Sequence, residues 1–144
     1  MTTYFEDVEV GEEREFGSYD VTAEEIVEFA EKYDPQPFHV DPEAAEESIY
    51  GGLIASGWHT ASMCMRMLVD GFFSDLAAVG SPGVDELRWR APVRPGDTLS
   101  VRTEVAKKEA TRPESGMVDI DTAVSNEEET VMTMSARVIV ARRD

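Results

Sequence analysis

One stretch near the middle of the chain is almost free of charge, although 30% of the 144 residues are charged. Residues 53–69, LIASGWHTASMCMRMLV, contain a single formally charged side chain, Arg66. The stretch is too polar to span a membrane, because serine, threonine and histidine side chains interrupt it. It is therefore expected inside a folded domain, and Ser56 is a suitable N-cap for a helix that begins at Gly57 and runs to about Val69.

The apolar side chains of this segment are spread around the expected helix. Four of them run along one side, namely Trp58, Ala61, Met65 and Leu68, whereas Met63 and Met67 occupy another. A helix that is apolar on several sides needs cover on those sides. We therefore predict that a second layer wraps most of its circumference, with the methionines as core residues or, alternatively, as the lining of a flexible acyl tunnel.

The first half of the chain has helical patterns before this segment. Thr22-Ala23-Glu24-Glu25 has the form of a capping box, and apolar residues with a helical spacing follow it. This helix should end at Asp34, since a residue before proline avoids the helical conformation. Asp41, followed by Pro42, predicts the start of another short helix that reaches about Ile49.

The second half of the chain has the alternation of strands. Apolar residues alternate with polar ones over 87–93 and 99–105, with a turn at 94–97, and two further strands are expected at 117–124 and 131–140. An antiparallel sheet wrapped around one long buried helix is the simplest arrangement that buries both. We predict an α+β fold in one domain, residues 1–144, because this length suits a single core.

The charge balance excludes two classes of partner. The chain has 30 Asp and Glu against 13 Lys and Arg, a net charge of −17. Nucleic acids and anionic membranes are bound through cations, so neither is expected as a partner. The acidic, lysine-poor composition resembles that of proteins from salt-loving archaea, with an ordinary acidic protein as the alternative. The N-terminus lacks signal-peptide features and the one cysteine, Cys64, lies among methionines, so we expect a cytoplasmic protein with a buried thiol.

The segment YDPQPFHVDP contains the best candidates for acid–base chemistry. It has three prolines in ten positions and places Asp34 five residues before His39. The prolines should force an extended, rigid path between the two side chains. A rigidly held carboxylate and imidazole suit catalysis, although spacing alone favours a capping or core role for these residues. Asp41 is assigned to helix capping.

The same segment resembles the active-site loop of the MaoC-like dehydratases, also called (R)-specific enoyl-CoA hydratases or hydratase 2. That family has the pattern D-x-N-P-Φ-H-x-D/E, and residues 34–41 are DPQPFHVD here. Residues 92–99, PVRPGDTL, also resemble the family's strand–turn–strand motif. The resemblance extends from about Phe5 to Arg137. It implies a hot-dog fold. Gln36 replaces the family's usual asparagine, and its extra methylene is expected to alter either the active-site loop or the substrate range.

The resemblance implies a hydro-lyase that adds water reversibly to a 2-enoyl-CoA thioester and gives an (R)-3-hydroxyacyl-CoA. Asp34 and His39 would activate the water, and the Gly57 N–H would stabilise the thioester oxygen, with the missing side chain leaving room for the thioester. Gln36 is included among the substrate-binding candidates. Ser62 would bond the dyad or the water, or alternatively its own helix.

Other candidates are less specific. Arg88 and Arg94, on one strand with Arg90, are candidates for binding coenzyme A phosphates, with a solvated surface as the alternative. His59 is expected to have a structural role, although it could reach the site. No metal and no cofactor are expected, because coenzyme A is part of the substrate.

Two other functions stay open. A hot-dog thioesterase is disfavoured, since such enzymes often place a carboxylate on the central helix and residues 57–69 contain none. A non-catalytic acyl-CoA-binding subunit is the other alternative. A homodimer or a larger homo-oligomer, with sheets joined edge to edge, is expected because an isolated unit leaves a strand edge exposed.

Overall fold

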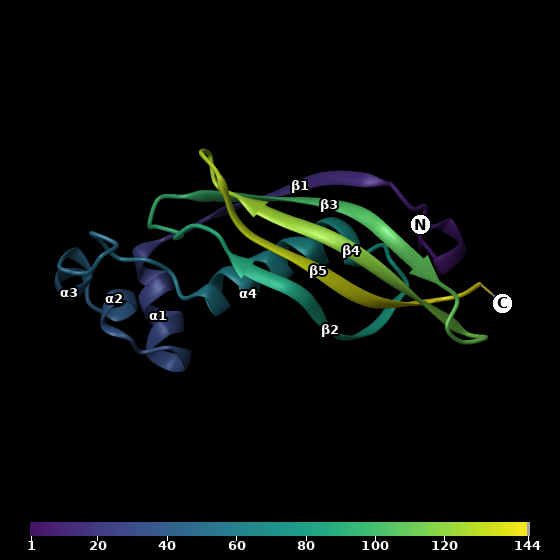
Figure 1. Ribbon diagram of the computed structural model, residues 1–144, viewed down its shortest axis with the longest axis horizontal. Helices are drawn as coiled ribbons and strands as arrows, with labels where there is room; N and C mark the ends of the chain where they lie inside the picture. Colours follow the sequence, from purple (N-terminus) through teal and green to yellow (C-terminus); the bar gives the residue numbers. More distant parts are fainter. Residues whose placement is uncertain (144) are drawn as a thin grey trace.

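The computed structural model of the protein describes residues 1–143 and has a single five-stranded sheet at its centre (Figure 1). The strands are β1 (Glu13–Asp20), β2 (Ala78–Trp89), β3 (Thr98–Glu109), β4 (Ser115–Ser125) and β5 (Thr130–Ala141). Their order in the sheet is β1-β3-β4-β5-β2, and every neighbouring pair is antiparallel. Strands β1 and β2 are therefore the two edges.

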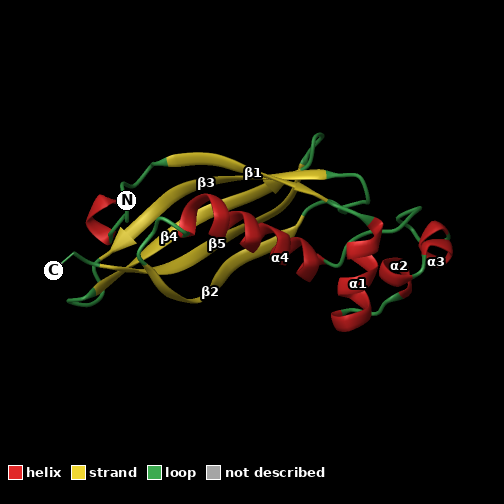
Figure 2. Ribbon diagram, turned by 180° about the vertical axis from the view of Figure 1, so that it is seen from behind, coloured by secondary structure: helices red, strands yellow, loops and turns green. Residues whose placement is uncertain are grey.

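Helix α4 (Gly57–Leu68) lies along one face of this sheet, as seen from behind in Figure 2. Its buried face includes Met63, Cys64, Met67 and Leu68, which pack against alternate residues of the inner strands, such as Leu99, Ile120 and Met132. The α+β hot-dog arrangement expected from the sequence is thus confirmed. The short turn η2 (Val69–Phe73) continues the helix before the chain returns to β2.

The expectation that a layer wraps most of this helix is wrong for the described chain. Trp58 and Met65 are 59% and 45% exposed. A single curved sheet covers only one side of a helix, and the opposite side of α4 faces outward. Cys64 is fully buried, as expected, and burial raises the pKa of its thiol to about 12.

Three further helices lie beyond one end of the sheet, next to the first turn of α4 (Figures 1 and 2). They are α1 (Ala23–Tyr33), α2 (Pro37–Val40) and α3 (Pro42–Glu46). The predicted caps are present, because the Thr22 hydroxyl accepts from the Glu25 amide and the Asp41 carboxylate accepts from the Glu43 amide. Helix α3 ends at Glu46, earlier than the predicted Ile49.

The path between Asp34 and His39 also differs from the prediction. We expected an extended segment, but Pro37 occupies the first position of α2 and His39 lies within that helical turn. Proline has no N–H to lose at this position and its φ suits a helix. The prolines therefore still stiffen the segment, with a tighter path than an extended one.

Two strands lack a clear sequence signal. Strand β1 has only two apolar side chains, and the first half of β2 contains Gly80, Pro82 and Gly83. Proline and glycine are tolerated in this half of β2 because β2 is an edge strand. Strand β2 ends at Trp89, so residues 90–93 of the predicted strand lie outside it.

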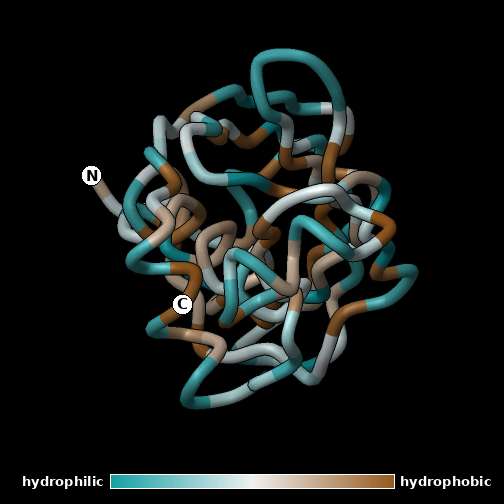
Figure 3. The backbone as a smooth tube through the Cα atoms, turned by 90° about the vertical axis from the view of Figure 1, so that its left-hand side faces the viewer, coloured by the Kyte–Doolittle hydropathy of each residue, from teal (hydrophilic) through white to brown (hydrophobic). Residues whose placement is uncertain are grey.

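The outer loops are largely hydrophilic in the end-on view of Figure 3. At the other end of the molecule from α1, the turn η1 (Phe5–Asp7) precedes β1 and buries Phe5. Within residues 1–143, no helix has both the length and the apolar character needed to cross a bilayer.

Candidate active site

His39 is held by a backbone segment that precedes α4. The side chain is 6% exposed, and its Nδ1 atom lies 2.7 Å from the Ile54 carbonyl oxygen. A carbonyl oxygen can only accept, so Nδ1 carries the proton and donates it. The Ile54 N–H in turn donates to the Phe38 carbonyl at 3.3 Å. These bonds fix the ring, and Nε2 faces Asp34.

Asp34 follows α1 as its C-cap and lies beside this imidazole. Its Oδ2 atom is 3.3 Å from His39 Nε2 and accepts a hydrogen bond from the Ser56 hydroxyl at 2.7 Å. Its Oδ1 atom accepts from the Gln36 side-chain amide, also at 2.7 Å. Burial raises the pKa of Asp34, but the hydrogen bonds from Ser56 and Gln36 outweigh it, so the pKa is lowered overall. The group is therefore a carboxylate at neutral pH.

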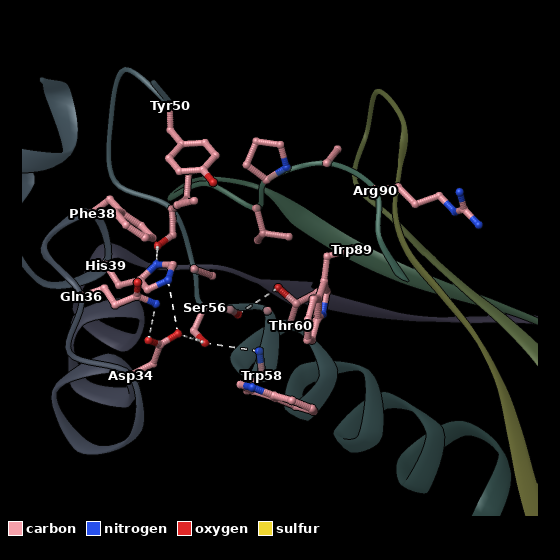
Figure 4. Close-up of a pocket in the computed structure, with 16 residues that line it drawn as sticks. Asp34, Gln36, Phe38, His39, Tyr50, Ser56, Trp58, Thr60, Trp89 and Arg90 are labelled. Carbon is pink, nitrogen blue, oxygen red and sulfur yellow. Dashed lines mark hydrogen bonds and ion pairs between the residues drawn. The ribbon is translucent and has the colours of Figure 1, made fainter. Parts of the chain in front are cut away.

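The Asp34–His39 pair opens into a cavity of about 570 Å³. Figure 4 shows Asp34, Gln36, His39 and Ser56 together, with Tyr50 above them and Trp89 on the other side of the view. The remaining walls are mainly apolar and come from four segments, with Phe38, Ile54, Ala55, Ala91, Pro92 and Val93 among the lining residues. An apolar cavity with a few convergent polar groups is typical of a small-molecule site.

Gly57 lines the same cavity, but its missing side chain has a different use from the one expected. A Cβ atom at this position would lie 2.4 Å from Cε2 of Trp89. The space beside the Gly57 Cα is thus filled by the Trp89 indole, which packs over the start of α4, and is not open to a thioester. The Gly57 N–H, at the first helical position, still has no carbonyl acceptor within the helix.

The structure brings together four of the seven residues singled out from the sequence. Asp34, Gln36, His39 and Gly57 line the cavity. Gln36 contacts the carboxylate itself through its side-chain amide. The roles of these residues in turnover remain predictions.

The other three lie elsewhere. The Ser62 hydroxyl donates to the Trp58 carbonyl of its own helix at 2.8 Å, so the expected contact with the dyad is not made. Arg94 donates to the Tyr50 carbonyl at 2.6 Å and thereby ties down the loop before α4. Arg88 is exposed, with its guanidinium 3.8 Å from Glu86. Neither arginine is among the residues that line the cavity, although residues 89–93 between them do.

Sequence reasoning missed several residues of the site. Ser56 was expected only as an N-cap, a role it also has, with its oxygen 3.3 Å from the Trp58 amide. Arg90 was noted only as a member of the arginine cluster, yet it is among the residues that line the cavity, and its Nε donates to the Thr133 hydroxyl at 2.9 Å. Trp58 and Trp89 form an edge-to-face pair with ring centres 5.1 Å apart. Only the alternation of 87–93 hinted at Trp89.

Similarity to known proteins agrees with this geometry. The family model described as a MaoC like domain matches residues 6–128. A solved MaoC-like dehydratase from Rhodospirillum rubrum is 39% identical, with a TM-score of 0.88 and 99% of each chain covered.

Two curated relatives are similar over most of the chain. The uncharacterized protein YdeM of Bacillus subtilis is 32% identical over 78% of this chain and 79% of its own length. The 3-hydroxybutyryl-CoA dehydratase of Methylorubrum extorquens is 35% identical over 72% of this chain and 64% of its own length. Together with the matched family model, these similarities show that the chain belongs to the MaoC-like domain family.

Proposed function

We propose that the protein is a hydro-lyase that adds water reversibly across the 2,3-double bond of an enoyl-CoA thioester. The observation that carries this proposal is the Asp34–His39 pair, whose proton-accepting atoms face an apolar cavity. Two similar proteins are named as a MaoC-like dehydratase and a 3-hydroxybutyryl-CoA dehydratase, which supports the same class of reaction.

The protonation states of the pair suit the activation of water. His39 donates through Nδ1 to Ile54, so its Nε2 atom has a lone pair that faces the Asp34 carboxylate. His39 Nε2 and Asp34 Oδ2 are two acceptors 3.3 Å apart, so a proton donor is favoured beside them. A water molecule that donates one hydrogen bond to each atom meets this need. The pair takes one proton from this water, the water oxygen bonds to C3, and a proton returned from the pair bonds to C2.

Charge that develops on the thioester oxygen needs a hydrogen-bond donor. The Gly57 N–H is the proposed donor, because it opens the twelve-residue helix α4, lines the cavity and lies at the positive end of the helix dipole. The Trp89 indole blocks the Cβ side of Gly57, so the thioester is expected to approach from the side of the Asp34–His39 pair.

The product is proposed to be the (R)-3-hydroxyacyl-CoA, which rests on the resemblance of residues 34–41 to the hydratase 2 motif. The protein is also expected to act as a homodimer. Strand β2 is an exposed edge, and the outward side of α4 carries exposed apolar side chains. Pairing of two β2 edges would satisfy the free backbone groups of both strands.

The direct test is the loss of enoyl-thioester ultraviolet absorbance with crotonyl-CoA as substrate. The assay uses molar potassium chloride, because a net charge of −17 opposes the compact state unless it is screened. We expect rapid loss with the unaltered protein, a loss of activity with Asp34→Ala, and a 3-hydroxybutyryl product of R configuration on chiral analysis.

The same assay separates the alternatives. Appearance of a free coenzyme A thiol would indicate a thioesterase, whereas binding without absorbance loss, unchanged by Asp34→Ala, would indicate a binding subunit. Either result with crotonyl-CoA and with longer or branched enoyl-CoA substrates would overturn the proposal.

A further inference from the structure

A second contact between a carboxylate and an imidazole lies beside the first turn of α4, apart from the Asp34–His39 pair. Glu25 Oε1 is 3.0 Å from His59 Nε2 and also accepts a hydrogen bond from the Tyr19 hydroxyl. The Phe29 ring stacks on the imidazole, with ring centres 4.7 Å apart and planes within 9°. These residues border a separate cavity of about 300 Å³.

The contact at Glu25 and His59 is not arranged for proton transfer to a ligand. The imidazole side chain is 4% exposed, and its Nδ1 atom is the one enclosed side-chain nitrogen or oxygen in residues 1–143 without a hydrogen-bond partner. A proton on Nδ1 would be a buried donor with no acceptor, so the proton is assigned to Nε2, which donates to Glu25. The ring therefore presents no accessible lone pair.

The three polar groups join three separate elements. Tyr19 belongs to β1, Glu25 to α1 and His59 to α4. Helix α1 runs from Glu25 toward Asp34, its C-cap, and α4 runs from its N-cap Ser56 to His59 within one turn. The Ser56 hydroxyl donates to Asp34. The two helices thus meet at two points, one at Glu25 and His59, the other at the carboxylate of the proposed active site.

We infer that Glu25 and His59 are positioning residues, which fix α1 against α4 so that the Ser56 hydroxyl stays in hydrogen-bond reach of Asp34 and holds the carboxylate beside His39. This positioning role rests on the proposed function, and it adds residues outside the cavity that holds Asp34 to those on which the function depends. Asp34 lies nine residues after Glu25, about 13 Å along a helix that rises about 1.5 Å per residue. A small rotation of α1 at Glu25 is therefore enlarged at Asp34.

The protonation states of the contact support this role. Burial and the nearby Glu25 raise the pKa of Tyr19 to about 12, so the phenol stays a donor. Burial raises the pKa of Glu25, but the hydrogen bonds from Tyr19 and His59 outweigh it and lower the pKa overall. The carboxylate therefore stays an acceptor of both bonds at neutral pH.

The test removes the contact from either end and asks whether the effect acts through Ser56 and Asp34. His59→Leu and Glu25→Ala remove the contact, whereas His59→Gln and Glu25→Gln keep a donor or acceptor in place. Glu28→Ala is the control, because Glu28 is an exposed glutamate that lines the same cavity without joining the contact. We expect the two removing variants to lower kcat for crotonyl-CoA by about 10- to 100-fold, the effect of a small misplacement of a catalytic group. The amide variants and Glu28→Ala should stay within about threefold.

A Ser56→Ala background separates positioning from stability. If the contact acts through the bond from Ser56 to Asp34, adding His59→Leu to Ser56→Ala should lower kcat further by less than about threefold. The fall in Tm caused by His59→Leu should be the same in the unaltered protein and in Ser56→Ala. A full additional 10- to 100-fold loss of kcat would overturn the inference. If His59→Leu does not fold, Glu25→Ala serves the same test, because the Glu25 side chain is 40% exposed.

A second readout does not depend on turnover. The chain has two histidines, so the imidazole nitrogen spectrum of His59→Leu or His59→Gln contains His39 alone. We expect the His39 ring resonances to match the unaltered protein in His59→Gln and to shift in His59→Leu and Glu25→Ala. If the unaltered protein shows no turnover, the proposed function fails, and this spectrum still decides the positioning role. Unchanged His39 resonances in both removing variants would overturn it.

Discussion

Two contacts between a carboxylate and an imidazole flank the first turn of α4, and they differ in what the imidazole leaves free. His39 uses Nδ1 to donate to Ile54 and directs Nε2 toward Asp34 and a cavity of about 570 Å³. His59 uses Nε2 to donate to Glu25 and has its Nδ1 enclosed. The first ring keeps a lone pair at a cavity, and the second does not.

The difference follows from the hydrogen-bond acceptor that fixes the proton on each ring. A backbone carbonyl next to His39 fixes the proton on Nδ1 and leaves Nε2 as an acceptor. The carboxylate of Glu25 is already bonded by Tyr19 and takes the Nε2 proton of His59 as a second donor. The same pair of residue types is therefore suited to acid–base chemistry in one place and to holding helices together in the other.

Replacing each histidine by glutamine should give the largest contrast. His39→Gln removes the accepting nitrogen, so kcat/KM for crotonyl-CoA should fall by about 10²- to 10⁴-fold, the usual contribution of an acid–base group. His59→Gln keeps an N–H that can donate to Glu25 and should stay within about threefold. Steady-state kinetics on folded protein, checked by circular dichroism, measures both. Equal losses would remove the distinction between the two contacts.

Ser56→Ala should have the next largest effect. A hydrogen bond to a charged group contributes about 1.5–3 kcal/mol, which corresponds to roughly a 10- to 100-fold loss of kcat/KM if all of it acts in turnover. Ser56 also helps to keep the pKa of Asp34 low. Without this bond the pKa rises, so the proposed base is protonated at a higher pH than before.

The pH profile of kcat/KM measures this second effect. Its acidic limb should lie below the ordinary range of an aspartate in the unaltered protein and move to higher pH in Ser56→Ala. An acidic limb that stays in place, with circular dichroism unchanged across the range, would show that Asp34 is not the titrating group.

Gly57→Ala tests the wall of the cavity that holds the Asp34–His39 pair. The new Cβ would lie 2.4 Å from the Trp89 indole, and overpacking of this kind costs about 1–3 kcal/mol. Gly52→Ala is the matched control, because its Cβ would be no closer than 3.4 Å to the Arg94 guanidinium. Denaturant unfolding should show the loss for Gly57→Ala alone. Equal stability of the two variants would contradict the close packing of Trp89 on α4.

Tyr19→Phe should have the smallest effect. It removes one of two donors to Glu25 and leaves the bond from His59. Because the Glu25 side chain is 40% exposed and water can replace the lost donor, the free energy of unfolding should fall by only about 1 kcal/mol. Turnover should change less than about threefold, since α1 and α4 remain joined. A loss as large as that of His59→Leu would assign the positioning role to β1 rather than to the contact between the helices.

The fold was predictable where periodicity and capping are strong. The Thr22 cap, the start of α4 after Ser56 and the alternation of β3, β4 and β5 are all present as predicted. Strand β1 and the first half of β2 were not predicted, because edge strands need few apolar residues and tolerate glycine and proline. The exposed side of α4 was not predicted either, since periodicity gives the faces of a helix but not which of them the sheet covers.

The candidate site was predictable only in part for a similar reason. Asp34 and His39 lie close in sequence, so a short motif was enough to select them. The bond from Ser56 to Asp34 joins residues 22 positions apart, and the packing of Trp89 on Gly57 joins residues 32 apart. Neither contact has a signature in local spacing, because each depends on how α1, α4 and the end of β2 meet.

The most direct test of the account replaces each carboxylate by its amide and measures crotonyl-CoA hydration in molar potassium chloride. Asp34→Asn keeps an oxygen that accepts from Ser56 but cannot take a proton from water, whereas Glu25→Gln keeps an acceptor for Tyr19 and His59. We predict a fall in kcat of about 10²- to 10⁴-fold for Asp34→Asn and less than about threefold for Glu25→Gln. Near-normal turnover of Asp34→Asn, or an equal loss in Glu25→Gln, would contradict the account.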